Sequence, residues 1–158
     1  SEPVFFELLS KELPVTFMDY RAEEDSEFLA EADAAMENFK SLNSAYKFEI
    51  AKYVLVNFKD FCSYVEEEDI PDTMGNVNEL NVLNFVYPTE IFVSRRASND
   101  KDIYILLASE CEWDPEHGLQ FVFRQGKKLT RVSDQDGHLT HADAYDIPDS
   151  EDELLSAF

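Results

Sequence analysis

The stretch DIYILLASECEWDPEHGLQFVFRQGKKLTRVS, Asp102 to Ser133, decides the fold class of this chain. It contains three runs rich in Ile, Leu, Val, Phe and Tyr, residue types that are enriched in β-strands. The short groups DPEHG and GKK separate these runs, and a fourth run, TEIFVSRR, precedes them at 89–96. Because loops this short join antiparallel neighbours, the sequence predicts a four-strand antiparallel meander over residues 89–133.

Upstream of the meander, apolar residues recur at helical rather than strand spacing. A first helix is predicted within FLAEADAAMENFKSL, 28–42, behind a cap at Asp25 or Ser26. A second is predicted within AYKFEIAKYVLVNFKDFCSYV, 45–65, capped by Ser44, and a short third one within VNELNVLNFVYP, stopped before Pro88. The apolar faces expected for the first two helices are Phe28 or Leu29, Ala32, Met36 and Phe39, and then Phe48, Ala51, Leu55, Phe58, Cys62 and Val65.

The remaining segments complete an α+β layout. VFFELLSKELPVTFMDY, 4–20, reads as a hairpin around the polar break Ser10-Lys11-Glu12, and IPDSEDELLSAF as a loosely held acidic tail. We therefore expect a mainly antiparallel sheet with an N-terminal hairpin, two main helices packed on one face and a C-terminal four-strand meander. These elements would form a single domain, 1–158, divided into hairpin 1–20, helical part 25–85, meander 89–133 and acidic tail 146–158.

The chain carries 34 acidic and 13 basic side chains, a formal net charge of −21. Such a field repels nucleic-acid phosphates and anionic lipid, so we expect no nucleic acid and no membrane among the partners. A basic protein would instead be attracted. The 44% hydrophobic content excludes a generally disordered acidic chain, because there is enough apolar surface to build a core.

Two cysteines, Cys62 and Cys111, lie inside apolar runs rather than in a Cys-dense frame. Free buried thiols in a reducing compartment are the expectation. No apolar run approaches the roughly 20 residues that span a bilayer. The opening SEPVFFELLSKELP also lacks the basic start of a secretory signal, so we expect a cytoplasmic protein.

The loop VSDQDGHLTHADAYD, 132–146, resembles a calcium loop in its Asp-x-Asp-Gly core. Val132 at the first position and Asp143 at the last are poor ligands, so a turn in which Gly137 supplies positive φ explains the pattern better. The spacing His138-x-x-His141 also suits zinc. A metal-binding module or metal-dependent hydrolase therefore remains the alternative, with the ligands His117, Asp134, Asp136, His138 and His141.

The segment CEWDPEHGLQFVF, 111–123, contains the only tryptophan and an adjacent Glu116-His117 pair. Asp114-Pro115 and Gly118 explain a tight hairpin tip, and Trp113 is expected in the core rather than at a partner surface. No nucleophile or phosphate loop accompanies Glu116-His117, which argues against an acid/base centre. Six nearby basic residues are expected to act as balancing surface charges: Arg95, Arg96, Arg124, Lys127, Lys128 and Arg131.

The run from Val93 to Tyr145 resembles a family of small acidic bacterial proteins built around an uncharacterised domain. The shared pattern is a Trp-x-x-Glu-His-Gly-Leu turn, a Gly between two strands and a Val-x-x-x-Asp-Gly-x-x-Thr ending. What the resemblance implies is no activity but an analogy with immunity proteins that neutralise toxic enzymes. The matching positions are Trp113, Glu116, His117, Gly118, Leu119, Gly126, Val132, Asp136, Gly137 and Thr140.

These observations favour a non-enzymatic, acidic protein-binding protein without a cofactor, in a more specific form an immunity-type inhibitor of a basic toxin. A structural or regulatory domain without a ligand is a further alternative. The oligomeric state is left open. The acidic residues expected to contact the partner are Glu27, Glu31, Asp33 and Glu37 in the first helix, and Glu66, Glu67, Glu68 and Asp69 in the following loop.

Overall fold

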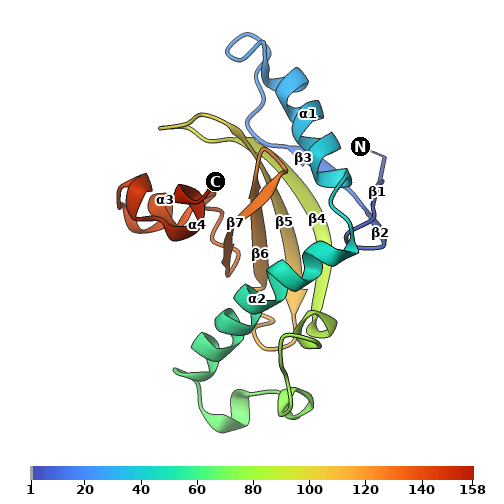
Figure 1. Ribbon diagram of the computed structural model, residues 1–158, viewed down its shortest axis with the longest axis vertical. Helices are drawn as coiled ribbons and strands as arrows, with labels where there is room; N and C mark the ends of the chain where they lie inside the picture. The colour runs from blue at the N-terminus through green and yellow to red at the C-terminus, as the bar shows by residue number, and fades with distance from the viewer. Residues whose placement is uncertain (1) are drawn as a thin grey trace.

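A five-stranded mixed sheet lies at the centre of the molecule, in a computed structural model that describes residues 2–158 (Figure 1). The strands β4 to β7 pair antiparallel in sequence order, and β3 adds parallel to β4 at one edge. The predicted meander is therefore present, as part of a sheet that is mixed. The strands, in their order across the sheet, are β3 (Val15–Phe17), β4 (Val86–Arg95), β5 (Ile103–Cys111), β6 (Leu119–Arg124) and β7 (Lys128–Ser133).

The N-terminal hairpin consists of β1 (Val4–Phe6) and β2 (Lys11–Leu13), which form a separate two-stranded sheet. The turn falls earlier than expected, because Ser10 takes a positive φ of 51° and Lys11 already belongs to a strand. Lys11 also donates from its ammonium to the carbonyl of Pro88, 2.9 Å away. The chain then enters the central sheet through β3, an element that the expected two-strand hairpin did not contain.

Two long helices, α1 (Phe28–Lys40) and α2 (Lys47–Cys62), lie over the inner face of the sheet. The expected apolar face of α1 is confirmed for Phe28, Ala32, Met36 and Phe39. In α2 the expected face is confirmed for Ala51, Leu55 and Phe58, whereas Phe48 is 68% exposed. The buried residues of α2 are Ile50, Ala51, Val54, Leu55 and Phe58.

The expected helix caps are present only in part. Asp25 pairs with Arg95 and also interacts with the backbone amides of Glu27 and Phe28 at the start of α1, where the side chain of Glu27 makes no capping hydrogen bond. The turn before α2, a 3-10 helix at Ser44–Tyr46, is capped by Asn43, whose side chain accepts a hydrogen bond from the amide of Ala45. The neighbouring Asn thus takes the role that Ser44 was expected to fill.

The third predicted helix is wrong. Within 77–88 only a 3-10 turn forms, at Val82–Phe85, and β4 begins at Val86. Pro88 lies inside β4 beside a register shift between Pro88 and Glu90. Proline has no N–H to donate, and an irregular register removes the need for one, so this strand accommodates a residue that was expected to end a helix.

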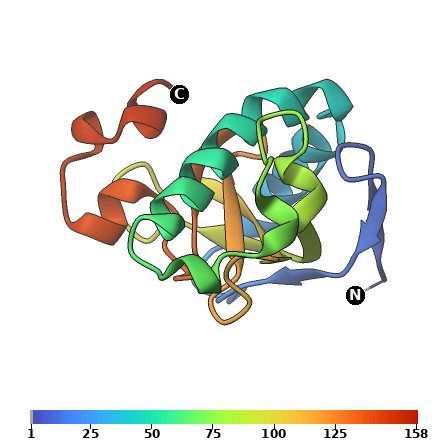
Figure 2. The same ribbon diagram turned by 90° about the horizontal axis from the view of Figure 1, so that it is seen from below.

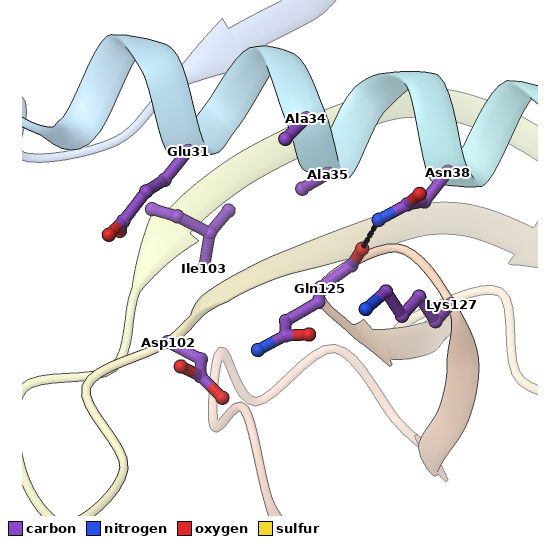
Figure 3. A pocket seen from close by; sticks show the side chains of 8 residues that line it. All are labelled: Glu31, Ala34, Ala35, Asn38, Asp102, Ile103, Gln125 and Lys127. Atoms are coloured by element: carbon purple, nitrogen blue, oxygen red, sulfur yellow. Dashed lines mark hydrogen bonds between the residues drawn. The ribbon is translucent and has the colours of Figure 1, made fainter.

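The β6–β7 turn is pressed against α1. Gln125 and Gly126 both have positive φ, 52° and 67°, and Asn38 of α1 donates to the carbonyl of Gln125 at 3.0 Å (Figure 3). A Cβ on Gly126 would lie 2.0 Å from the carbonyl oxygen of Ala35. Only glycine can therefore occupy this position.

The C-terminal segment is packed rather than loose, which corrects the expected acidic tail at 146–158. Its helices, α3 (His141–Tyr145) and α4 (Glu153–Ser156), lie on the outer face of the sheet. Ala142 and Leu155 pack there in one cluster with Tyr104, Leu106 and Val122. Figures 1 and 2 show these helices on the side of the molecule opposite the N-terminal hairpin.

Buried arginines hold several of these elements, which corrects the expectation of balancing surface charges. Arg96 is 1% exposed and binds Asp100, Asp143 and Asp149. Arg131 is 5% exposed.

Both cysteines are free thiols. Among residues 2–158, no helix combines the length and apolar character needed to cross a membrane.

Candidate functional site

A groove of about 590 Å³ lies where the end of α2, the loop that follows it and the β5–β6 turn come together. We call it the acidic groove, because four carboxylates line it and histidine is its only basic side chain. It combines one of the predicted partner-binding residues of the 66–69 loop with three of the pattern residues at the hairpin tip. Its lining residues are Asn57, Phe61, Tyr64, Val65, Asp69, Trp113, Asp114, Pro115, Glu116, His117 and Asp134.

The β5–β6 turn is organised by Asp114. Its carbonyl accepts a hydrogen bond from the amide of Gly118 at 2.9 Å. Its carboxylate accepts from the amide of His117 at 3.2 Å and lies 3.0 Å from Nδ1 of the same histidine. The imidazole is therefore held at the rim by a side chain that is itself only 17% exposed.

The second pattern segment, 132–140, meets this turn in space. The amide of Gln135 donates to the carbonyl of His117 at 3.2 Å, and its side-chain amide donates to the carbonyl of Ser109 at 2.7 Å. Gly118 has a φ of 66°, and a Cβ there would lie 2.7 Å from the Gln135 side chain. Glycine at 118 is thus required both by its φ and by this close contact.

One wall of the acidic groove is aromatic. Trp113 is buried, as expected, and donates from Nε1 to the side-chain oxygen of Asn57 at 3.1 Å. Its ring packs edge-on against Phe58 of α2, with centroids 5.8 Å apart. Phe61 and Tyr64 form a second edge-on pair at 5.9 Å, and Tyr64 is 74% exposed.

The groove concentrates negative charge near titratable rings. The hydrogen bond to Asp114 is the main cause that raises the pKa of His117, and the charges of Asp114, Glu116 and Asp134 act in the same direction. Partial burial raises the pKa of Tyr64, as do the carboxylates of Asp114 and Asp134. The carboxylates around His117 thus favour a cation over an anion at this end of the groove.

The segment around Asp136 is a turn built on internal hydrogen bonds. Arg131 binds Asp136 through two contacts of 2.6 and 2.7 Å, and the amide of His138 donates to the same carboxylate. Burial acts to raise the pKa of Asp136, but the hydrogen bonds from Arg131 and His138 hold it below its ordinary value. Gly137 has a φ of 79°. Both oxygens of Asp136 are thus engaged by the protein.

The alternative metal ligands are not brought together. His117 and Asp134 line the acidic groove, whereas His141 packs against the ring of Tyr145 with centroids 4.4 Å apart. Within residues 2–158, no group of three or more His, Cys, Asp or Glu side chains has an arrangement that could hold a metal ion. Thr140 accepts a hydrogen bond from the amide of Asp143 and caps α3.

The other predicted partner-binding residues are dispersed. Glu66, Glu67 and Glu68 are exposed beside the acidic groove but do not line it. Glu31 pairs with Arg95 and borders a smaller hollow of about 210 Å³ under α1, which Figure 3 shows. Glu27 is exposed at the start of α1. The last two of the set, Asp33 and Glu37, line a separate groove described below.

Four residues of this region were missed from the sequence. Asn57 and Phe61 come from the last turns of α2, Tyr64 follows the end of that helix, and Gln135 links the two pattern segments. The one available signal was the spacing of Phe61 and Tyr64, three residues apart within the helix predicted over 45–65, which would place them on one side of it. Nothing in the sequence connects that side with a turn 50 residues further on.

Comparison with known proteins gives one match. Searches among curated proteins and among solved structures each found none. Residues 1–139 match a domain of unknown function, DUF6985, and the segment that forms α3 and α4 follows the matched region. The expected uncharacterised domain family is confirmed, while the residue pattern and the analogy with immunity proteins stay predictions. The chain belongs to the family of the domain of unknown function DUF6985.

Proposed function

We propose that this chain is a non-enzymatic protein-binding domain whose acidic groove receives a basic segment of a partner protein. The observation that carries the proposal is the convergence of Asp69, Asp114, Glu116 and Asp134 on one groove of about 590 Å³ beside an exposed tyrosine. These carboxylates come from three separate segments of the chain. Only folding brings them together.

The chemistry of the groove suits an arginine or lysine side chain. A guanidinium donates hydrogen bonds to carboxylates in a fixed planar fork, and it also stacks on aromatic faces. Tyr64, 74% exposed, offers such a face next to the carboxylates. A cation over an aromatic ring at an exposed site contributes about 0.5–1 kcal/mol. Arginine would use both features at once.

A binding role is also supported by what the described lining of the groove consists of. It contains no Ser, Thr, Cys or Lys side chain that could serve as a nucleophile next to His117. The Nδ1 atom of His117 already faces Asp114. The histidine thus has a partner that would orient it, but no Ser, Thr, Cys or Lys side chain in this lining that it could activate.

The more specific form of the proposal is an immunity-type inhibitor of a basic toxin. The net charge of −21 supports it, because a strongly acidic chain accelerates encounter with a basic enzyme and competes for a site that binds phosphate. Co-expression with the product of the adjacent gene tests this form. A complex that weakens with salt and protects cells from that product is expected; a product that neither binds nor harms cells would remove the toxin from the proposal.

The groove itself is tested by calorimetric titration with a short peptide that alternates Gly and Arg. A peptide with citrulline, the neutral isostere of arginine, is the ligand control. The double variant Asp69→Asn/Glu116→Gln should weaken arginine-peptide binding about fivefold to tenfold, as expected for two partly exposed ion pairs at roughly 0.2–1 kcal/mol each. Both side chains are exposed, so the fold should be unaffected.

The matched protein control is Glu67→Gln/Glu68→Gln. It removes the same number of charges, from the loop that carries Asp69, at residues that do not line the groove. It should bind the arginine peptide almost as well as the unaltered chain. Equal weakening in both double variants would show that only the overall charge attracts the peptide, and the proposal would then be wrong.

A further inference from the structure

A second groove, of about 550 Å³, lies between α1, the strand β1 and the edge strand β3. We call it the edge groove. It is formed by the N-terminal part of the chain, whereas the acidic groove is formed by the end of α2 and the β5–β6 turn. Figure 1 shows α1, β1 and β3 away from the C-terminal end of α2. Its floor includes Val4, Phe17 and Met36, and its rim includes Asp33, Glu37 and Lys40.

The floor of the edge groove is apolar and anchored in the core. Met36 is 7% exposed and belongs to the main core cluster, against which Val4 packs. Phe17 is 38% exposed, and its ring lies edge-on to that of the buried Phe28 with centroids 5.7 Å apart. An apolar surface held in this way is available for a ligand without rearrangement of the fold.

The rim carries a net negative charge, because only one of its two α1 carboxylates has an ion-pair partner within residues 2–158. Asp33 and Glu37 are exposed and lie four residues apart on α1, a spacing at which like charges destabilise a helix by a few tenths of a kcal/mol. Lys40 forms an ion pair with Glu37 at 2.9 Å. Among the described residues, Asp33 has no ion-pair partner within 4.0 Å. A positive group placed beside Asp33 would supply the ion-pair partner that this carboxylate lacks.

The charge of the chain selects the occupant. A second copy would bring another −21 charges to a rim that is already negative. We propose that the edge groove binds a basic amphipathic segment of a protein partner, with an apolar side chain on Phe17 and Met36 and Lys or Arg side chains on Asp33 and Glu37. An apolar centre with a charged rim is the usual anatomy of such interfaces. This surface is independent of the acidic groove.

Fluorescence anisotropy tests the proposal with a labelled Leu/Lys peptide. Its Leu residues are spaced to form one face of a helix, and its Lys residues form the other face. The ligand control has every Leu replaced by Ser, so that the charge is kept and the apolar face is lost. Titrations use the whole chain, 1–158, at about 0.15 M salt, where the Debye length is about 8 Å and distant charges are screened. The Leu/Lys peptide should bind at least about tenfold more tightly than the Ser/Lys peptide.

The double variant Asp33→Asn/Glu37→Gln should weaken Leu/Lys binding about fivefold. Its matched control is Glu23→Gln/Glu27→Gln, which removes two exposed charges from the residues that precede α1 and should leave binding unchanged. The acidic-groove variant Asp69→Asn/Glu116→Gln should also leave it unchanged. If the arginine peptide does not bind the acidic groove, the Leu/Lys peptide can still bind the edge groove. If the Leu/Lys peptide does not bind, the test of the acidic groove still stands.

Two results would overturn the proposal. If both peptides bind equally, or if both α1 double variants weaken binding to the same extent, then general charge attraction accounts for the signal. If sedimentation shows a dimer that dissociates on dilution and excludes the peptide, then a second copy occupies the edge groove instead.

Discussion

Arg96 and Asp149 join the end of β4 to the C-terminal segment through two hydrogen bonds, Nη1 to Oδ2 at 2.9 Å and Nη2 to Oδ1 at 2.7 Å. The same guanidinium donates twice to Asp143 and once to Asp100. Arg96 is 1% exposed, and four of these five hydrogen bonds hold the α3–α4 segment on the sheet. The segment lies beyond the part of the chain that matches DUF6985.

Arg96→Met should destabilise the fold by about 3 kcal/mol. Removing one partner of a buried ionic network leaves the other charges without compensation, at a cost of about 3–5 kcal/mol. The low end applies because the Asp143 and Asp149 side chains are 28% and 34% exposed and can be partly hydrated. Chemical denaturation measures the change in the free energy of unfolding. The stability of Arg96→Lys should lie between those of the unaltered chain and Arg96→Met, because lysine keeps the charge but loses the planar fork.

Amide exchange separates a local effect from a global one in that variant. Faster exchange is expected at residues 141–158 and at Tyr104 and Leu106, which pack beneath them. Unchanged exchange at 141–158 in Arg96→Met would show that Arg96 does not fasten this segment.

Acid should release the same segment. The hydrogen bonds from Arg96 are the main cause that lowers the pKa of Asp149. Burial acts to raise the pKa of Asp100, but the hydrogen bonds from the Asp102 amide, Arg96 and Tyr104 together hold it below its ordinary value. A carboxyl whose folded pKa is depressed contributes stability that is present above its unfolded pKa and is lost as the pH falls through the folded value. We therefore expect thermal stability to fall below about pH 4, and to fall less in Arg96→Met. Parallel curves for the two proteins would contradict the assignment.

The glycines of the two pattern turns should differ in their sensitivity to substitution. Gly137 has a φ of 79° but open space around its Cα, so Gly137→Ala should cost only about 1 kcal/mol for the left-handed backbone. Gly118→Ala adds a clash with Gln135 and Ser109 and should cost more. His138→Ala removes an exposed side chain and should change the melting temperature least. A larger loss in His138→Ala than in Gly137→Ala would indicate a ligand-binding role for that imidazole.

Binding of basic peptides to the acidic groove should strengthen as the pH rises. Protonated His117 neutralises Asp114, and the hydrogen bond between them raises the pKa of the histidine. Loss of that proton leaves the carboxylate available to the peptide, so the affinity should increase as the pH passes upward through the His117 pKa, above about 6.5. Calorimetry at a series of pH values measures this change. His117→Gln should give a flat profile; an unaltered slope would place the titrating group elsewhere.

The strand and helix content was predictable where local patterns match burial. The strands β5 to β7 and the buried face of α1 follow directly from their β-branched, aromatic and apolar spacing. The buried face of α2 was predicted only in part, because its apolar residues surround much of the helix and their spacing alone did not fix which side is buried. The strand β3 was not separable from the hairpin, since its partner in β4 lies more than 70 residues away.

The C-terminal segment was misjudged for a different reason. It buries few apolar side chains, and its attachment depends on Arg96. Nothing in the sequence distinguishes this arginine from its neighbour Arg95. The candidate site divides in the same way. Asp69, Glu116 and His117 were identified singly, but their meeting with Tyr64 depends on long-range packing through Trp113 and Asn57.

The most direct test of binding in the acidic groove is a nitrogen-15 NMR titration of residues 1–158 with the Gly/Arg peptide. Binding in the acidic groove predicts that the amide shifts concentrate at Phe61, Tyr64, Asp69, Glu116 and His117, and that the citrulline peptide causes none of them. Small shifts spread evenly over the acidic surface, with no cluster at these five residues, would contradict the account.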